Sequence, residues 1–163
     1  MIAIDAESGQ ITLSEGHVLV PAMTRGELMK IPGIRSGGPM GNEESFSLPS
    51  QFAVGERWDF DLHTEGGMLS SIGMSCAFNA LMTTHLKHVH FLKLNLGREP
   101  DSSTPAQDWC GDGELSPVKE FPAWSFNWGS AFAGHNNRWG YCQIAIVYAI
   151  PARKSLFSRL FGG

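Results

Sequence analysis

Apolar and charged side chains alternate along residues 57–63, which places one set on each face of an extended chain. Residues 65–67, Glu-Gly-Gly, are typical of a turn, and inward apolar positions continue over residues 68–74. The pattern predicts two half-buried strands joined as a hairpin. The side chains expected on the buried face are Trp58, Phe60, Leu62, Met68, Ile72 and Met74.

A helical period governs residues 79–96, where apolar side chains recur three and four positions apart. The members of this stripe are Phe78, Leu81, Met82, Leu86, Val89, Leu92 and Leu96. Gly97 suits the left-handed residue that ends many helices, and Pro100 follows it closely. We expect this helix to lie across the sheet that its neighbouring strands form.

Two short elements are predicted on the N-terminal side of the hairpin of residues 57–74. Residues 7–9, Glu-Ser-Gly, separate two apolar runs and predict a turn between short strands. Thr24 and Glu27 have the spacing of a capping box, in which each side chain accepts a backbone amide of the other residue. The helix that begins there must be short, because Pro32 and Gly33 end it.

Two polar segments are predicted to be long surface loops, which are uncommon in compact domains and often functional. Residues 33–50 are poor in apolar side chains and rich in Gly, Pro and Ser. Residues 98–120 are polar apart from Trp109 and Cys110. The acidic side chains of the second loop are Glu99, Asp101, Asp108, Asp112 and Glu114, with Glu120 at its end.

The segment from Trp124 to Ile150 predicts two closing strands, with a turn at residues 134–137, Gly-His-Asn-Asn. Trp124 and Trp128 are an even number of residues apart, so we expect them to share a face of the first strand. After Tyr141, apolar side chains fall on both faces. That pattern is typical of a central strand covered on both sides.

Together these elements predict a single α+β domain over residues 1–151. It would be an antiparallel β-sheet with one principal helix packed on one face and a short capped helix near the N-terminus. Residues 152–163 would follow as a basic amphipathic tail. The length of 163 residues and the 42 % of hydrophobic residues are sufficient for a substantial core.

Composition and charge make some classes of function less compatible with the chain. The net charge of −4 disfavours binding to nucleic acid through phosphate neutralisation. The N-terminus lacks the basic and apolar regions of a signal peptide, and no run is long enough to span a membrane. We therefore expect a cytoplasmic protein without stable membrane insertion. The three cysteines lack CxxC spacing and predict reduced thiols.

Few residues suggest catalysis or metal binding. His85 and His88, three apart on the predicted helix, could supply two metal ligands, but the sequence has no HExxH motif. A core histidine with one hydrogen bond is the ordinary explanation at such positions, so we predict no metal and no cofactor. Carboxylates around Cys110 oppose thiolate formation, and Cys142 has the parity of the inward-facing residues, so neither predicts a nucleophile.

The segment from Phe126 to Tyr148 reads FxWGxAxAGxxxxxGYxxIxIxY, and the predicted helix ends in LxxxLG over Leu92 to Gly97. With the order of the other elements, this pattern resembles small bacterial proteins encoded near secreted polymorphic toxins, some regarded as cognate immunity proteins. The resemblance implies a cytosolic, non-catalytic protein that binds one toxin and blocks its active site. It assigns no binding residues.

We therefore predict a non-catalytic protein-binding module, in which an acidic loop over residues 99–114 meets a basic partner and large aromatics anchor the complex. The predicted partner-binding residues are Glu99, Asp101, Asp108, Trp109, Asp112, Glu114, Trp124, Trp128 and His135. One alternative is a small enzyme or ligand-binding domain with a helix–sheet pocket lined by His85, His88 and Tyr141. Another is a homo-oligomeric subunit that associates through the tryptophan face.

Overall fold

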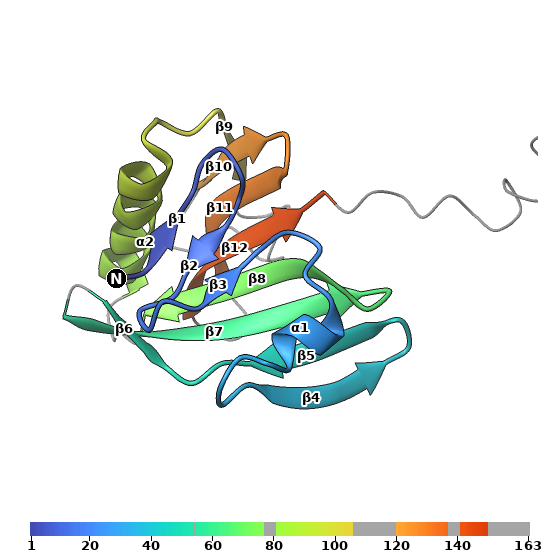
Figure 1. Ribbon diagram of the computed structural model, residues 1–163. Helices are drawn as coiled ribbons and strands as arrows, with labels where there is room; N and C mark the ends of the chain where they lie inside the picture. The colour runs from blue at the N-terminus through green and yellow to red at the C-terminus, as the bar shows by residue number, and fades with distance from the viewer. Residues whose placement is uncertain (54, 77–80, 106–119, 137–140, 150–163) are drawn as a thin grey trace, which may run out of the picture.

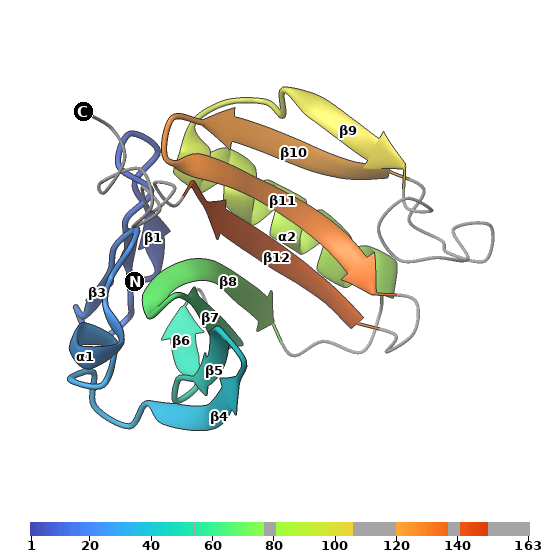
Figure 2. The same ribbon diagram turned by 90° about the vertical axis from the view of Figure 1, so that its right-hand side faces the viewer.

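The computed structural model describes residues 1–53, 55–76, 81–105, 120–136 and 141–149. In this part of the chain a large antiparallel sheet has the strand order β4-β5-β7-β8-β12-β11-β10-β9, and β6 pairs with β7 (Figures 1 and 2). Its strands are β4 (Arg35–Met40), β5 (Glu43–Ser47), β6 (Gln51–Ala53), β7 (Glu56–Glu65), β8 (Met68–Cys76), β9 (Ser102–Pro105), β10 (Glu120–Phe126), β11 (Gly129–Asn136) and β12 (Tyr141–Tyr148).

Two helices and a second, small sheet accompany it. The small sheet has the order β1-β2-β3 and consists of β1 (Ala3–Ile4), β2 (Ile11–Thr12) and β3 (Val18–Leu19). The helices are α1 (Arg25–Leu28) and α2 (Leu81–Leu96). The predicted α+β class with an antiparallel sheet is therefore confirmed. No helix in the described part of the chain is long and apolar enough to cross a membrane.

One face of the large sheet carries the core. The helix α2 contacts β11 and β12 on this face and also contacts β1 of the small sheet. The backbone amide of Ile4 donates to Oδ1 of Asn95 on α2 at 3.0 Å, which joins the small sheet to the helix. Buried side chains from β2, β7, β8 and β12 form one hydrophobic cluster with these elements. Figure 2 shows α2 behind β11 and β12.

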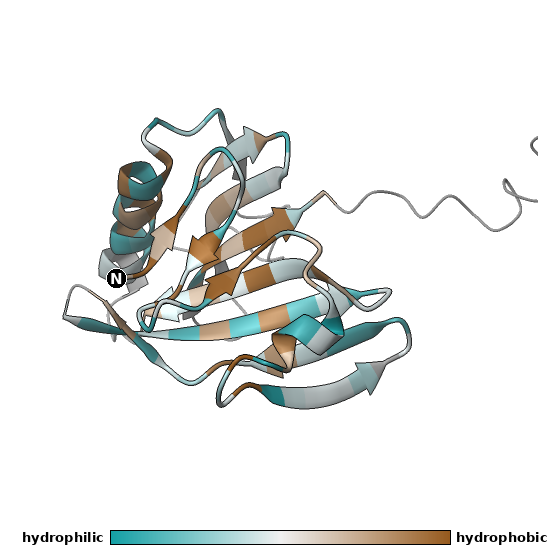
Figure 3. Cartoon of the chain, viewed as in Figure 1, coloured by the Kyte–Doolittle hydropathy of each residue, from teal (hydrophilic) through white to brown (hydrophobic). Residues whose placement is uncertain are grey.

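The alternating segment forms the hairpin that the sequence predicts. Trp58, Phe60 and Leu62 of β7 are buried, as are Ile72 and Met74 of β8. Figure 3 shows hydrophobic and hydrophilic residues alternating along β7. The strand β12 lies between β8 and β11, so its predicted central position is also confirmed. It is not covered on both sides as predicted, because Val147 is 40 % exposed.

The predicted local signals near the N-terminus and after the main helix are confirmed as well. The hydroxyl of Thr24 accepts the amide of Glu27 at 3.3 Å, and the Glu27 carboxylate accepts the amide of Thr24 at 2.8 Å. Gly97 follows α2 with φ of 67°, and its amide donates to the Lys93 carbonyl at 2.9 Å. Residues 7–9 connect β1 to β2, and Gly9 has φ of 72°.

The prediction of a long loop over residues 33–50 is wrong, because β4 and β5 form a hairpin there. A strand pair is held by backbone hydrogen bonds, so an edge hairpin needs few apolar side chains. Here Phe46 is the buried aromatic, while Ser and Gly occupy half of the remaining strand positions. The second predicted loop also contains a strand, β9, at its start.

In the closing segment, the turn and the strand ends lie at other residues than the sequence predicts. Asn127 and Trp128 form the tight turn between β10 and β11, so Trp124 and Trp128 do not share one strand face. The strand β11 continues through Asn136, and residues 134–136 are therefore strand rather than turn. Gly129 makes the turn possible, because a Cβ there would lie 2.0 Å from the carbonyl oxygen of Val147.

The predicted apolar stripe of the long helix is only partly its buried side. Leu92 and Leu96 are buried, but Leu86 is 60 % exposed. The buried face of α2 is completed by the polar residues Thr84, His85 and His88. The helix is therefore rotated relative to the apolar stripe, with histidine and threonine turned towards the sheet.

Candidate binding groove

The face of the large sheet opposite α2 holds a groove of about 790 Å³. Figure 2 shows this face of β10, β11 and β12 towards the viewer. The groove crosses the strands from β4 to β11. Its polar lining residues are Arg35, Ser36, Ser45, Ser47, Asp61, His63, Ser71 and Gln143.

Strand register explains why these side chains meet. Successive cross-strand pairs place Arg35, Ser47, Asp61, Gly73, Ala145 and Phe132 in one row across the sheet. A parallel row contains Ser45, His63, Ser71 and Val147. Directly opposed residues on one face have adjacent side chains, so these rows form a continuous floor. Half of the members are Gly, Ala or Ser, whose small side chains leave the floor recessed.

Gly73 lies in the middle of the floor. A Cβ at this position would stand 3.6 Å from Nε2 of Gln143 and 3.7 Å from the carbonyl oxygen of Asp61, which are ordinary contact distances. The backbone could therefore accept a side chain there, and the space above Gly73 is available for a ligand. Substitution of Gly73 gives a direct means of filling the groove.

The groove contains charges that no described residue neutralises. Elsewhere in the described part of the chain, Arg25, Arg57 and Arg98 each form an ion pair with a carboxylate. Arg35 is exposed and forms none with a described residue. Asp61 is likewise exposed and has no hydrogen-bond partner among the described side chains. An unpaired cation and an unpaired carboxylate in one groove can both engage a ligand.

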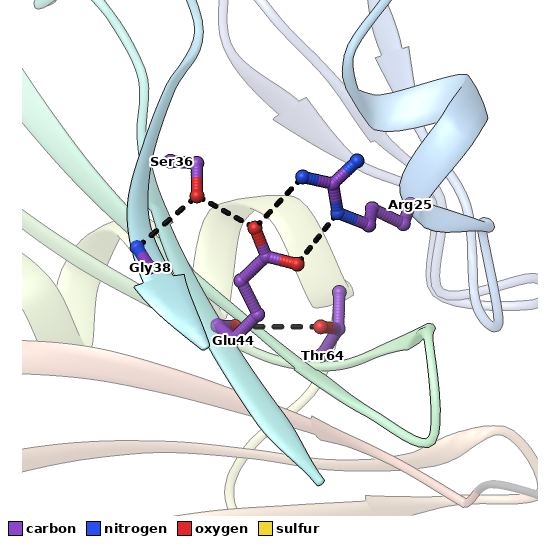
Figure 4. A network of polar contacts seen from close by, with 5 residues as sticks. All are labelled: Arg25, Ser36, Gly38, Glu44 and Thr64. Carbon is purple, nitrogen blue, oxygen red and sulfur yellow. Dashed lines mark hydrogen bonds and ion pairs between the residues drawn. The ribbon is translucent and has the colours of Figure 1, made fainter. Parts of the chain in front are cut away.

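The hairpin of β4 and β5, which forms one wall of the groove, is stabilised by the half-buried carboxylate of Glu44. Its carboxylate accepts two hydrogen bonds from Arg25, at 2.7 and 3.2 Å, and one from the hydroxyl of Ser36 at 2.6 Å (Figure 4). These bonds, first of all those from Arg25, lower the pKa of Glu44. The Ser36 hydroxyl also accepts the amide of Gly38 at 3.1 Å. The network connects α1 to the hairpin next to Arg35.

A second cavity of about 370 Å³ shares Arg35, Ser47 and Asp61 with the groove and extends it towards residues 49–59. There the carboxylate of Asp59 already has partners. Its Oδ1 accepts the Ser50 hydroxyl at 2.6 Å, and Arg57 donates to both of its oxygens. The charges without a partner among the described residues, Arg35 and Asp61, therefore lie where the two cavities meet.

A separate polar site is buried between α2 and the sheet. The Sγ of Cys76 lies 3.3 Å from Nε2 of His88, which also accepts the backbone amide of Cys76 at 3.3 Å. Burial raises the pKa of Cys76 to about 11, and the nearby Glu56 carboxylate adds to this. Burial lowers the pKa of His88 to about 4, with His85 contributing. Thiol and imidazole are therefore both neutral near pH 7.

This pair lacks the features of an activated nucleophile. Reactive cysteines have a lowered pKa and some access to solvent, whereas Cys76 is buried and its pKa is raised. Cys142 faces the interior as predicted, and burial raises its pKa to about 11. Within the described ranges, no three His, Cys, Asp or Glu side chains are placed to hold a metal ion.

The structure changes the interpretation of the two predicted tryptophan contacts. Trp124 is 0 % exposed, and its indole donates to the Arg98 carbonyl at 3.0 Å. Trp128 is 9 % exposed and donates to the Ala6 carbonyl at 3.0 Å. Both therefore pack in the core, which corrects the prediction that their rings face a partner. For the same reason these two residues do not form the tryptophan face predicted for self-association, and Trp109 and Trp139 lie outside the described residues.

Of the other predicted contact residues, some have partners within the protein and others lie outside the described residues. Asp101 is held by Arg98 at 3.0 Å and by the Ser125 amide at 2.7 Å, which gives it a role in the β9–β10 edge. Glu99 is exposed and forms an ion pair with Lys93. For His135 only the backbone, in β11, is described. The remaining predicted contacts, which lie outside the described residues, are Asp108, Trp109, Asp112 and Glu114.

The structure describes only two of the three side chains that were predicted to line a helix–sheet pocket. His85 and His88 are buried between α2 and the sheet, and the side chain of Tyr141 lies outside what the structure describes. Sequence reasoning missed both Cys76 and the groove. The signal for the groove was the run of small or polar residues at outward positions of β8, Ser71 and Gly73, beside Asp61 and His63.

Comparison of the chain with protein-family models, with curated proteins and with solved structures found no match.

Proposed function

We propose that this protein is a non-catalytic binding module whose groove receives part of a protein partner. The observation that carries the proposal is the asymmetry of the large sheet. Its inner face is filled by α2 and the small sheet, whereas its outer face has a groove of about 790 Å³ with charges that no described residue pairs. A cavity of this size with a few convergent polar groups is typical of binding sites.

A binding role without catalysis agrees with the chemistry of the buried residues. The thiol of Cys76 and the imidazole of His88 are both held in their neutral forms away from solvent. The groove itself has Asp61 and His63 side by side on one strand face, where solvated carboxylates are ordinary. Neither arrangement supplies a nucleophile with an adjacent base.

The partner that fits the sequence resemblance is a secreted bacterial toxin, which the module would neutralise by covering its active site. The acidic residues Asp108, Asp112 and Glu114, with Trp109, remain predicted contacts in this proposal and lie outside the described residues. Complementary charge would accelerate the encounter, and the groove would provide the specific contacts. The proposal predicts a toxin gene immediately upstream and a complex of sub-micromolar affinity.

The test is co-expression of this chain with the product of the adjacent gene. The native chain is expected to protect cells and to co-purify with that product. The substitution Gly73→Leu fills the groove floor and is expected to abolish both effects, since its Cβ meets no atom closer than 3.6 Å and the fold is retained. Gly26→Leu is the matched control, because a Cβ at Gly26 of α1 contacts nothing within 4 Å. Equal protection by both variants would contradict the proposal.

A further inference from the structure

We infer that the groove binds an extended acidic peptide segment of the partner, which crosses the strands with its carboxylate on Arg35 and an apolar side chain on β12. This inference rests on the proposed function and adds the chemistry of the segment that is bound. It follows from the distribution of charge and apolar surface along the groove.

The groove is amphipathic along its length. Its β4–β7 end has the charged side chains of Arg35, Asp61 and His63, together with serine hydroxyls. Its other end has Ala145 and Val147 of β12, together with Phe132 of the neighbouring strand β11. Val147 is 40 % exposed although its neighbours in β12 are buried, so it offers apolar surface to a ligand. A ligand that fits both ends has an apolar group and a polar group separated by the floor at Gly73.

Strand spacing fixes the separation of these two groups. Neighbouring strands lie ~4.8 Å apart, and four spacings lead from Arg35 in β4 to Ala145 in β12. The floor between them is thus roughly 19 Å long, of which the arginine side chain covers part. An extended peptide advances ~3.3–3.6 Å per residue, so about four residue steps join the apolar end to the guanidinium. One extended segment of this length therefore spans the floor from Arg35 to Ala145.

The sign of the ligand charge follows from Arg35. A guanidinium matches a carboxylate with two parallel hydrogen bonds, and Arg35 is the arginine in the described ranges that has no carboxylate partner. Glu44, the nearest acidic residue of the same hairpin, is already occupied by Arg25 and Ser36. Asp61 remains as an acceptor for peptide amides that cross above it. His63 and the serines offer further hydrogen bonds to the peptide backbone.

The experiment uses five-residue peptides and the full-length protein labelled with ¹⁵N. All peptides begin with acetylated phenylalanine and have a Ser-Gly-Ser spacer. The first ends in glutamate amide, the second in glutamine amide, and the third in glycine with a free terminal carboxylate. Titrations follow the backbone amides of Ser71, Gly73 and Ala145 on the groove floor. The first and third peptides distinguish a side-chain carboxylate from a chain terminus.

The glutamate peptide is expected to bind about tenfold more tightly than the glutamine peptide, as a charge-assisted hydrogen bond allows. Arg35→Gln is expected to remove this preference. Lys30→Gln is the matched control, because it removes the same charge from an exposed position that does not line the groove. If the free-terminus peptide binds most tightly, the carboxylate comes from the end of a partner chain, and the inference holds.

Three results would overturn the inference: no saturable shift of the floor amides up to millimolar peptide, equal binding of the glutamate and glutamine peptides, or a preference that survives Arg35→Gln. These results leave the proposed function intact if Gly73→Leu still abolishes binding to the toxin. Retained toxin binding in Gly73→Leu contradicts the proposed function, whatever the peptides show. The two failures are therefore distinguishable.

Discussion

The imidazole Nε2 of His88 lies 3.3 Å from Sγ of Cys76 in the interior between α2 and the sheet. Because the same nitrogen accepts the backbone amide of Cys76, it is the unprotonated nitrogen of a neutral ring. The proton is then on Nδ1, which is buried and has no partner among the described residues. A charged ring at this position would be unfavourable, and this has a measurable consequence.

Protonation of His88 is expected to destabilise the fold as the pH falls. Its pKa is lowered from 6.5 to about 4, first by burial and then by His85. Because the folded-state pKa is the lower one, the contribution to stability is present above pH 6.5 and is lost between pH 6.5 and about 4. A shift of this size corresponds to roughly 3 kcal/mol. Urea unfolding at several pH values in this window measures it.

A matched pair of variants isolates this effect from the other titrating groups. His88→Gln is expected to flatten the loss of stability above pH 4.5, whereas His90→Gln, at an exposed position on the same helix, leaves it unchanged. The lowered pKa values of Asp5, Glu27 and Glu44 cause further losses only at lower pH, as these carboxylates become protonated. An unchanged profile in His88→Gln would contradict the assignment to His88.

The thiols of Cys76 and Cys142 are expected to resist alkylation in the native protein. Burial raises both pKa values to about 11, so almost no thiolate is present at pH 8. Treatment with iodoacetamide, followed by peptide mapping, should find both residues unmodified before unfolding and fully modified afterwards. Rapid native modification of Cys76 would instead identify an activated thiol beside His88 and would favour the enzyme alternative.

The extent to which the fold could be predicted depends on where each element lies in the sheet. The hairpin of β7 and β8 was predictable because one face packs on the core, so its apolar residues alternate. The hairpin of β4 and β5 was not, because at the sheet edge backbone pairing replaces apolar burial. The turn at Trp128 was missed because a buried tryptophan in a tight turn looks like a strand residue.

The candidate site was less predictable than the fold, because its members meet only through pairing between distant strands. Arg35 and Asp61 are brought into one row by the pairing of β4 with β5 and of β5 with β7. Their sequence separation gives no sign of this. Core histidines were expected on this helix, but the apolar stripe of residues 79–96 suggested that Leu86 would be buried too. The pairing of His88 with Cys76 was missed because Cys76 lies on a different element, β8.

The network around Glu44 is expected to stabilise the wall of the groove. Removing the carboxylate with Glu44→Ala leaves Arg25 and Ser36 without their shared partner, so the chain should unfold at lower urea concentration. Glu43→Ala is the control, because Glu43 is the adjacent exposed residue of β5 and has no described ion-pair partner. Amide hydrogen exchange should increase in β4 for Glu44→Ala alone. Equal effects of the two variants would show that Glu44 acts only as a surface charge.

The contact between the N-terminal hairpin and the large sheet is expected to depend on Gly9. Its φ of 72° is unfavourable for other residues, and a Cβ would lie 2.5 Å from the indole of Trp128. Gly16 has a similar φ of 84°, but a Cβ there would contact nothing within 4 Å. Gly16→Ala is therefore expected to cost about 1 kcal/mol from backbone strain alone. Gly9→Ala is expected to cost more, because steric overlap with Trp128 is added to the same backbone strain.

Thermal and urea unfolding of both variants test this difference. Gly9→Ala is expected to be at least about 2 kcal/mol less stable than the native chain, because overpacking adds roughly 1–3 kcal/mol to the strain. The indole of Trp128 would have to move, and its hydrogen bond to the Ala6 carbonyl at 3.0 Å would be lost. Its fluorescence should therefore shift to longer wavelength in Gly9→Ala and stay unchanged in Gly16→Ala. Equal stability of the two variants would show that the hairpin does not seat against Trp128.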